Sequence, residues 1–400
     1  MTESASHIIV LAYLLILLIV LVFVGLFGLR AWSIWFDRQT KRYTLKHQDY
    51  FEYVKSHLHE EAPLGKPSGA LTKTELKVIQ NKLFEWMEKI VGGERDKLTQ
   101  LCRDLGLVEL NIRRLRSEIH WTRLDAAYNL GVMQAHEAIP ELLQLLGEER
   151  YGSPAFVIAR AISKSAQTED ELDRMVRTIA KHRKRSHRLV AEVLALSRVD
   201  STPMLIGYLR ENDDELAKIA LTALQNRELP GALGLLSPFV RADDPELRLL
   251  AVQALVGQAA QLTEGHMAEL LRHEDADVRL AVVDALGRLD RPYALGLLKT
   301  GMTDSDRRVR SQSARSLAGL EDEGFRALCE VASGSEPGEA ALAGEVIQEE
   351  LTRGALGFDD FETAMRHSRR LGIYRQFFDA PETGLQPSGM ALGLSKGDTA

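Results

Sequence analysis

The hydrophobic residues of this chain follow two different patterns. Residues 8–29, IIVLAYLLILLIVLVFVGLFGL, form a run of 22 positions without a charged side chain. At a helical rise of about 1.5 Å per residue, this run would span roughly 33 Å, enough to cross a hydrocarbon core about 30 Å thick. After it, apolar residues recur at the three- and four-residue spacing of amphipathic helices. The pattern predicts one N-terminal transmembrane helix over 8–29, followed by an all-α body.

We expect the apolar run to be an uncleaved membrane anchor. A secretory signal begins with a basic region and ends at a small-residue cleavage site, whereas residues 1–7 contain no Lys or Arg and no Ala-x-Ala sequence follows the run. Positively charged flanks stay on the cytoplasmic side of a membrane. Here the flank after the run is basic, with Arg30, Arg38, Lys41, Arg42 and Lys46. The sequence therefore predicts a single-pass protein of the inner (plasma) membrane, with residues 1–7 as an extracytoplasmic N-terminus and the C-terminal domain in the cytoplasm.

A repeat occupies the second half of the chain. The segments 214–224, 246–255, 277–286 and 308–317 each end on a leucine, and these leucines are 31 residues apart. Weaker copies end at Leu130, Ile162 and Leu196. Self-similarity at such a period is typical of solenoid proteins. We predict about seven repeats between residues 120 and 320.

Each repeat is predicted to contain two helices. In the second helix, apolar residues lie at −8, −4, −1 and 0 from the final leucine, as at Val278, Val282, Ala285 and Leu286, and these offsets share one face of a helix. A first helix precedes it in most copies, at 138–146, 202–210, 230–240, 265–273 and 292–301. Such a pair cannot bury its apolar faces alone, but stacked pairs form a continuous core. The predicted fold is an α-solenoid of helical hairpins.

Charged residues recur with the same period. An aspartate stands where each second helix should begin, and aspartate is a strong N-cap; these residues are Asp213, Asp244, Asp275 and Asp306. An arginine follows four residues later in several copies, at Arg123, Arg248, Arg279 and Arg310. We expect these residues to form a structural ladder of caps and ion pairs between repeats. Leu189 and Ala217 occupy the arginine position in two copies, so we expect a break there.

These units resemble HEAT repeats. Residues 275–287 match the motif D-x-D-V-R-x-A-x-x-x-A-L-G, and residues 306–319 match it approximately. The resemblance covers about half the chain and implies a HEAT-like curved stack whose second helices line a concave face used to bind other proteins. The segment 114–146 also resembles bacterial single-span membrane-anchored HEAT-repeat proteins, some of which are encoded beside membrane glycosyltransferases.

The regions around the repeats have distinct compositions. We predict a juxtamembrane helix over 30–60, a linker rich in Pro and Gly over 61–70, and an N-terminal helical cap over 71–119. A C-terminal helical cap is expected over 321–380, followed by a disordered tail over 381–400.

Charge and cysteine content narrow the classes of partner. A net charge of −7 disfavours nucleic-acid binding, which needs a basic surface. Cys102 and Cys329 are too few for a disulfide framework or a thiolate metal site, and we predict no cofactor. The segment KHRKRSHR at 181–188 is locally basic. It is either a solvated turn or a contact for an acidic partner or lipid headgroups, made by Lys181, Arg183, Lys184, Arg185 and Arg188.

The positions of the His-Glu pairs in this sequence can be compared with those in catalytic HEAT proteins. Di-iron hydroxylases on HEAT scaffolds carry His-Glu pairs in the second helices of symmetrically placed repeats. Here the pairs His59-Glu60, His136-Glu137 and His273-Glu274 do not occupy equivalent positions, and no P-loop or G-x-S-x-G motif is present. We therefore predict that the protein is not an enzyme and has neither catalytic nor metal-binding residues. A HEAT-type lyase or another catalytic HEAT protein is the alternative of a different class.

The resulting functional hypothesis is a membrane-anchored, cytoplasm-facing HEAT-repeat scaffold or adaptor that binds a partner protein at the inner membrane. A more specific version is an accessory subunit of a membrane glycosyltransferase or polysaccharide-synthesis complex. The partners expected are a protein, which in the more specific version is a membrane enzyme, and the membrane itself through residues 8–29, with no nucleic acid.

Overall fold

The computed structural model describes most of the chain as helix. It covers residues 19–24, 27, 30, 38–149, 152–182, 186–225, 227–258, 261–289, 291–334, 337–356 and 361–378, and no strand occurs among them. These residues belong to two compact units, which divide between Met204 and Leu205. The prediction of an all-α protein is confirmed over the part of the chain that the structure describes.

Unit 1 contains short helices joined by short turns. Residues 38–46 are helical, and the labelled helices follow. They are α2 (Gln48–Ser56), α3 (Lys73–Met87), α4 (Gly93–Asp104), α5 (Leu107–Leu115), α6 (His120–Met133), the 3-10 helix η1 (His136–Ala138), α7 (Ile139–Glu148), α8 (Gly152–Ser165), α9 (Glu169–His182) and α10 (His187–Leu194).

Unit 2 continues the series. The division between the units lies within α11 (Thr202–Tyr208). The helices after it are α12 (Asp214–Leu224), α13 (Ala232–Val240), α14 (Pro245–Val256), α15 (Glu264–Leu271), α16 (Ala276–Leu286), α17 (Pro292–Gly301), α18 (Arg307–Gly319), α19 (Glu321–Ala332), α20 (Pro337–Leu356) and α21 (Phe361–Phe378).

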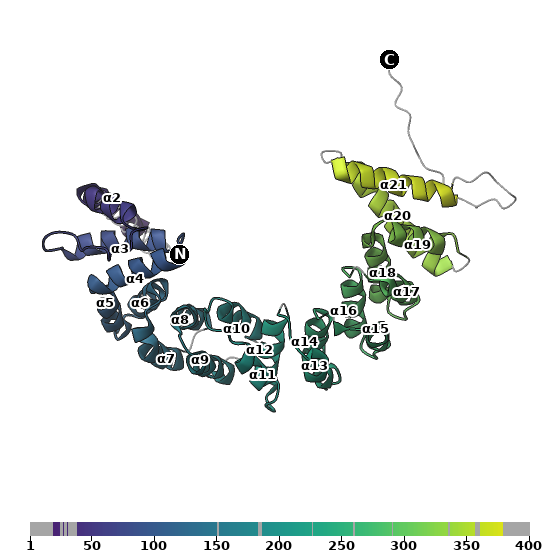
Figure 1. The fold of residues 1–400 in the computed structure, drawn as a ribbon, viewed down its shortest axis with the longest axis horizontal. Coiled ribbons are helices and arrows are strands. Elements are labelled where there is room, and N and C mark those ends of the chain that lie inside the picture. The colour runs from purple at the N-terminus through teal and green to yellow at the C-terminus, as the bar shows by residue number, and fades with distance from the viewer. Residues whose placement is uncertain are drawn as a thin grey trace, which may run out of the picture. The chain divides into compact units, whose positions relative to one another are not determined.

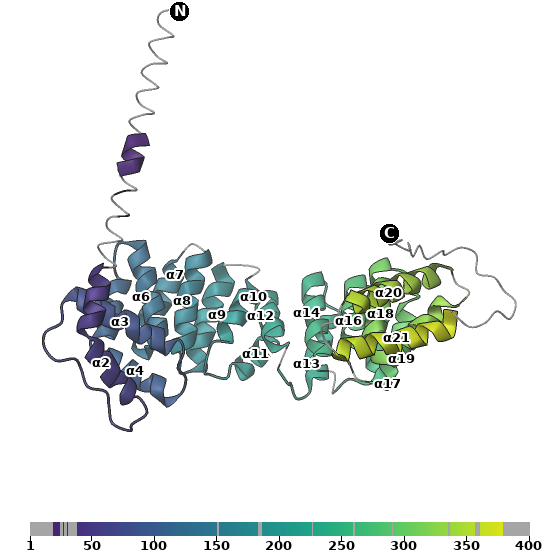
Figure 2. The same cartoon turned by 90° about the horizontal axis from the view of Figure 1, so that it is seen from above.

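Consecutive helices pack as hairpins, and the hairpins stack in two rows within each unit (Figure 1). In unit 1 the first helices α5, α7 and α9 form one row, and the second helices α6, α8 and α10 form the other. In unit 2 the second helices α12, α14, α16, α18 and α20 pack side by side, with α13, α15, α17 and α19 as their first helices. Figure 2 shows the same helices from above, with neighbours lying alongside one another. Hairpin stacking is thus observed in both units.

The buried residues explain the pairing. On α14 the repeated offsets Leu247, Ala251, Ala254 and Leu255 are all buried, and the same offsets on α16 are buried as well. Small residues at the middle positions allow neighbouring helices to approach closely. Ala223 on α12 departs from the pattern, since it is only half-buried. The periodicity in the sequence therefore corresponds to the face that each second helix turns towards its hairpin partner and its neighbours.

The predicted membrane localisation is corrected by the structure. Of the predicted span 8–29, residues 19–24 and 27 are described and helical, and the others lie outside the described residues. No helix in the described ranges is both long enough and apolar enough to cross a membrane. A span needs about 20 consecutive apolar residues, and charged residues interrupt α20 and α21, the described helices of at least 18 residues.

Candidate interaction surface

Each second helix in the middle of unit 2 begins at an aspartate. The Asp244 carboxylate accepts hydrogen bonds from the backbone N–H groups of Glu246 and Leu247 at the start of α14. Asp213 caps α12 in the same way, and Asp275 and Asp306 each accept one backbone N–H at the start of α16 and α18. These carboxylates satisfy donors that a helix leaves unpaired at its N-terminus.

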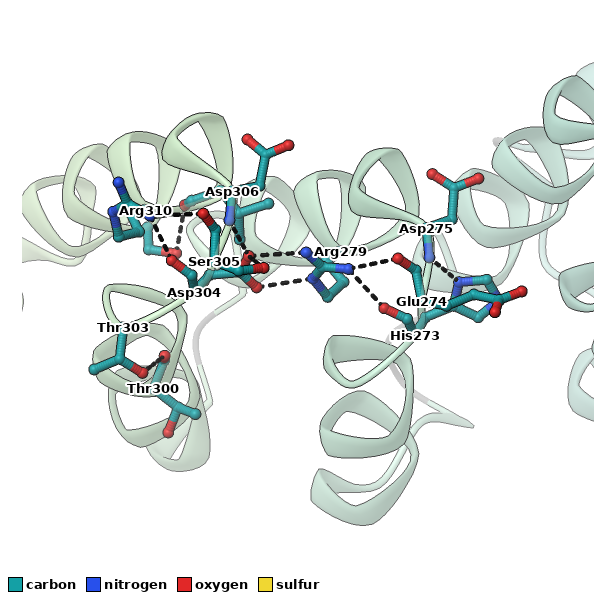
Figure 3. Close-up of polar contacts among 12 residues, drawn as sticks. His273, Glu274, Asp275, Arg279, Thr300, Thr303, Asp304, Ser305, Asp306 and Arg310 are labelled. Atoms are coloured by element: carbon teal, nitrogen blue, oxygen red, sulfur yellow. Dashed lines mark hydrogen bonds and ion pairs between the residues drawn. The ribbon is translucent and has the colours of Figure 1, made fainter.

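An arginine in the first turn then holds the preceding loop. Arg279 donates from one guanidinium nitrogen to the carbonyl oxygens of His273 and Glu274, at 2.8 and 2.9 Å (Figure 3). Arg310 makes the same pair of contacts with Asp304 and Ser305. In every case the acceptors precede the arginine by six and five residues, including at Arg123 and Arg248. The arginine therefore fixes the turn between the two helices of its own repeat.

The other edge of the guanidinium reaches the next repeat. Arg248 donates to the Asp275 carboxylate at 2.7 and 3.2 Å, so the cap of α16 is also the ion-pair partner of α14. Arg279 makes a two-point contact with Asp304 at 2.8 and 2.9 Å, and each of these two side chains is only 10 % exposed (Figure 3). Arg279 thus pairs with Asp304, two residues before the cap Asp306. Arginine suits this position because its planar group can donate to carbonyls and a carboxylate at once.

At Ala217, where we expected the ladder to lack a basic residue, the neighbouring Lys218 makes the ion pair instead. Lys218 is buried on α12, and its ammonium group lies 2.6 Å from the Asp244 carboxylate and 3.0 Å from that of Glu246. Sequence reasoning missed Lys218 because it sought arginine at a fixed offset, and it missed Asp304 because it sought the partner at the cap. A buried-face position occupied by a lysine was the available signal for the first.

These contacts favour the charged forms of the partners. The bond from Arg248 holds the pKa of Asp275 below its usual range, and Arg279 does the same for Asp304. Burial opposes the charge on Lys218, but its bonds to Asp244 and Glu246 outweigh burial and raise its pKa. Most donor groups of these basic side chains bond within the fold, so the ladder connects repeats. The exposed sides of the second helices face solvent.

The predicted basic segment is only partly described. Lys181 lies exposed in the last turn of α9, and Arg188 lies exposed in the first turn of α10. Arg183, Lys184 and Arg185 lie outside the described residues. A contact of this segment with an acidic partner stays a prediction.

The three His-Glu pairs lie in separate places. His59 contacts Glu94 at 2.6 Å, His136 contacts Glu171 at 2.8 Å, and the Nδ1 atom of His273 accepts from the backbone of Asp275. Within the described residues, no group of three His, Cys, Asp or Glu side chains is placed to hold a metal ion. The structure therefore does not bring the pairs together.

Comparison with known families follows from this geometry. The family model for HEAT repeats matches residues 263–345, the region of α15 to α20 in which the caps and arginines recur. The chain contains HEAT repeats. No curated protein matches the chain. This match supports a HEAT-repeat fold, whereas the resemblance to membrane-anchored relatives, a specific partner and a membrane role are not shown.

Solved structures with similar folds come from proteins of different kinds. YibA from Escherichia coli is 12% identical, with a TM-score of 0.36 over 71% of this chain and 98% of that one. Human deoxyhypusine hydroxylase in complex with glycerol is 18% identical, with a TM-score of 0.27 over 61% and 96%. The phycocyanin lyase complex of Nostoc is 17% identical, with a TM-score of 0.27 over 60% and 94%.

Two of these structures are of enzymes, which corrects the prediction that the chain is not an enzyme. Stacked helical hairpins can carry catalysis as well as binding, so the lack of a familiar motif in the sequence did not justify that prediction. At these TM-scores the similarity assigns no activity to the HEAT repeats of this chain either.

Proposed function

We propose that this protein is a scaffold that binds a partner protein along its rows of second helices. The observation that supports it is the side-by-side packing of the second helices. These are α6, α8 and α10 in unit 1 and α12, α14, α16, α18 and α20 in unit 2. Each helix buries one side in the stack and leaves another side exposed. Neighbouring helices together therefore offer a surface assembled from several repeats.

An assembled surface of this kind suits a macromolecular partner. Stable protein interfaces bury roughly 800 Å² on each side and draw their affinity from a few well-placed residues. Adjacent second helices can supply such an area, since every hairpin contributes a few exposed positions and the ladder fixes their spacing. A surface depression in unit 1 has a mostly polar lining that includes Arg116, Arg123 and Glu141.

Site-specific photo-crosslinking tests this proposal in the full chain. A photoreactive amino acid would be placed at exposed second-helix positions, Asp125, Gln253 and Arg315, and at matched exposed first-helix positions, Gln144, Arg174 and Glu269. The proposal expects one abundant crosslinked protein from second-helix positions, identified by mass spectrometry. Crosslinks from first-helix positions alone, or none from any position, would contradict it.

A further inference from the structure

Between residues 115 and 334, the highly exposed large apolar side chains of the described residues lie on or beside the second helices of unit 1. Among the described residues from 115 to 334, the large hydrophobic residues with high exposure are Ile119, Trp121, Tyr128, Leu189 and Leu196. All lie on or next to α6 and α10, and Trp121 is 77% exposed. The described second helices of unit 2 carry none. Single exposed hydrophobic residues need no explanation, but such clustering on one row marks an interaction site.

These residues lie on the solvent-exposed side of the second helices. Trp121 and Tyr128 are seven residues apart on α6, as are Leu189 and Leu196 at α10, and this spacing places each pair on one side of its helix. Between α6 and α10 lies α8, which packs against both. The exposed residues of α8 therefore separate two apolar strips.

The side chains that α8 places there are basic. Arg160 is exposed and Lys164 is partly exposed, four residues apart and so on one face. Neither forms an ion pair with any residue that the structure describes. Burial lowers the pKa of Lys164, and the nearby positive charges of Arg95 and Arg160 lower it further. The carboxylate of Glu88 acts in the opposite direction, so it partly offsets the positive charge of Lys164.

The aromatic and basic groups adjoin one another. The Tyr128 hydroxyl donates to the Glu88 carboxylate at 2.8 Å, and Glu88 is also close enough to act on the charge of Lys164. Burial and the nearby Arg198 lower the pKa of Arg95. Arg198, just after α10, is paired with Asp96 at 3.3 Å. Arg198 and Asp96 offset each other, which leaves Arg160 and Lys164 as basic groups of this face with Glu88 as a nearby carboxylate.

Unit 2 provides the contrast. Three basic residues on its second helices are used internally: Lys218 pairs with Asp244, Arg248 with Asp275 and Arg279 with Asp304. The described second helices of unit 2 carry no highly exposed large apolar residue beside such cations, whereas those of unit 1 do.

We propose that the α6–α8–α10 face, defined by Trp121, Tyr128, Arg160, Lys164, Leu189 and Leu196, binds an acidic segment of a partner protein that carries aromatic or aliphatic side chains. This inference rests on the proposed scaffold function and names the partner's chemistry. Carboxylates of the segment would pair with Arg160 and Lys164, and its apolar side chains would cover the two strips. Leucines suit peptide side chains better than nucleic-acid bases, which bind by stacking on aromatic rings.

The test begins with selection of binders from a random peptide library displayed against the full chain. Selected peptides are then labelled, and their dissociation constants are measured by fluorescence anisotropy. We expect peptides with net negative charge and leucine or aromatic residues. The double variant Arg160→Glu with Lys164→Glu should weaken binding by about tenfold or more, and Trp121→Ala with Leu189→Ala by a similar factor.

Matched controls separate the face from general effects. Arg272→Glu reverses an exposed charge at the C-terminal end of the first helix α15, and Val91→Ala shortens an exposed apolar residue in unit 1 outside this face. Both should bind the peptides within about twofold of the unaltered chain, an effect typical of residues outside a hot spot. If the glutamates disturb folding, the milder pair Arg160→Gln with Lys164→Gln replaces them, and its folding is checked by circular dichroism. This pair should also weaken peptide binding.

Several results would overturn the inference. One is the selection of neutral or basic peptides, and another is unchanged peptide affinity in both double variants. A third is displacement of the peptide from this face by a single-stranded oligonucleotide or by phosphatidylglycerol vesicles that bind more strongly. If photo-crosslinking identifies a partner whose binding is insensitive to the double variants, this inference fails while the scaffold function stands. If no partner crosslinks to any second-helix position, the scaffold function itself fails.

Discussion

The contacts of single side chains show why position in the sequence is a poor guide to partners. Arg248 pairs with the cap of the next helix, Arg279 pairs two residues before the next cap, and Lys218 takes the role from a neighbouring position. Long basic side chains can reach a carboxylate from more than one residue. The kind of contact is therefore repeated more faithfully than the residue that makes it.

Glu75 is a residue whose charge should matter for stability. It is buried at the start of α3, where Lys46 donates to it at 2.5 Å and Thr72 donates from its backbone and hydroxyl. These bonds, the one from Lys46 foremost, lower its pKa from 4.5 to about 2. A carboxyl whose pKa is lowered on folding stabilises the fold above its unfolded pKa and loses this contribution as the pH falls towards its folded value.

Glu75→Gln should therefore lower the urea midpoint at pH 7, and the difference from the unaltered chain should shrink as the pH falls from about 4.5 to about 2. Urea unfolding followed by circular dichroism at several pH values measures this difference. Glu109→Gln, at an exposed position on α5, is the matched control and should change the midpoint little. A difference at Glu75 that stays constant with pH would contradict the argument.

Helix packing depends on small residues at a few crossing points. Gly131 lies on α6 where this helix meets α8, and a Cβ atom there would lie 2.7 Å from the Cα atom of Ala161. Backbone cannot move aside as a flexible side chain can, so any added atom must separate the two helices. The close approach of α6 and α8 is what aligns their exposed sides into one face.

Gly131→Ala should lower the free energy of unfolding by about 1–3 kcal/mol, as expected for overpacking in a close-packed interior. Urea unfolding measures it. Gly147→Ala is the matched control, because Gly147 lies on α7 with no atom within 4 Å of an added Cβ; there alanine should stabilise the helix by roughly 0.5–1 kcal/mol. Equal effects of the two substitutions would show that α6 and α8 do not meet this closely.

At the scale of the whole molecule, the contacts are mostly between neighbouring hairpins. Each of α14, α16 and α18 touches its own first helix and the second helices before and after it. In such an array, stability is approximately a sum of repeat and neighbour terms, and a local defect is felt locally. Division into two compact units makes the same point, because most contacts lie within one unit or the other.

Arg279→Ala tests this locality. It removes one partner of a buried ion pair and two bonds to carbonyls, which should cost about 3 kcal/mol and speed amide hydrogen exchange about 100-fold in α15 to α18. Exchange in α6 and α8 should not change. Mass spectrometry of the exchanged peptides measures both, with Arg272→Ala as an exposed control. Faster exchange throughout the chain would mean that the array unfolds as one cooperative body.

By itself, the sequence determined the helical hairpins and where the second helices begin, because a period of 31 residues, the helical spacing of apolar positions and an aspartate cap are all local properties. It did not determine which carboxylate each basic residue would contact, because Asp304 and Lys218 form their ion pairs only when the hairpins stack. Nor did it reveal the α6–α8–α10 face: Tyr128, Arg160 and Leu189 are ordinary residues of three separate helices, far apart along the chain. Only the packing of these helices turns them towards the same solvent, because the exposed side of a helix is defined by what its neighbours cover.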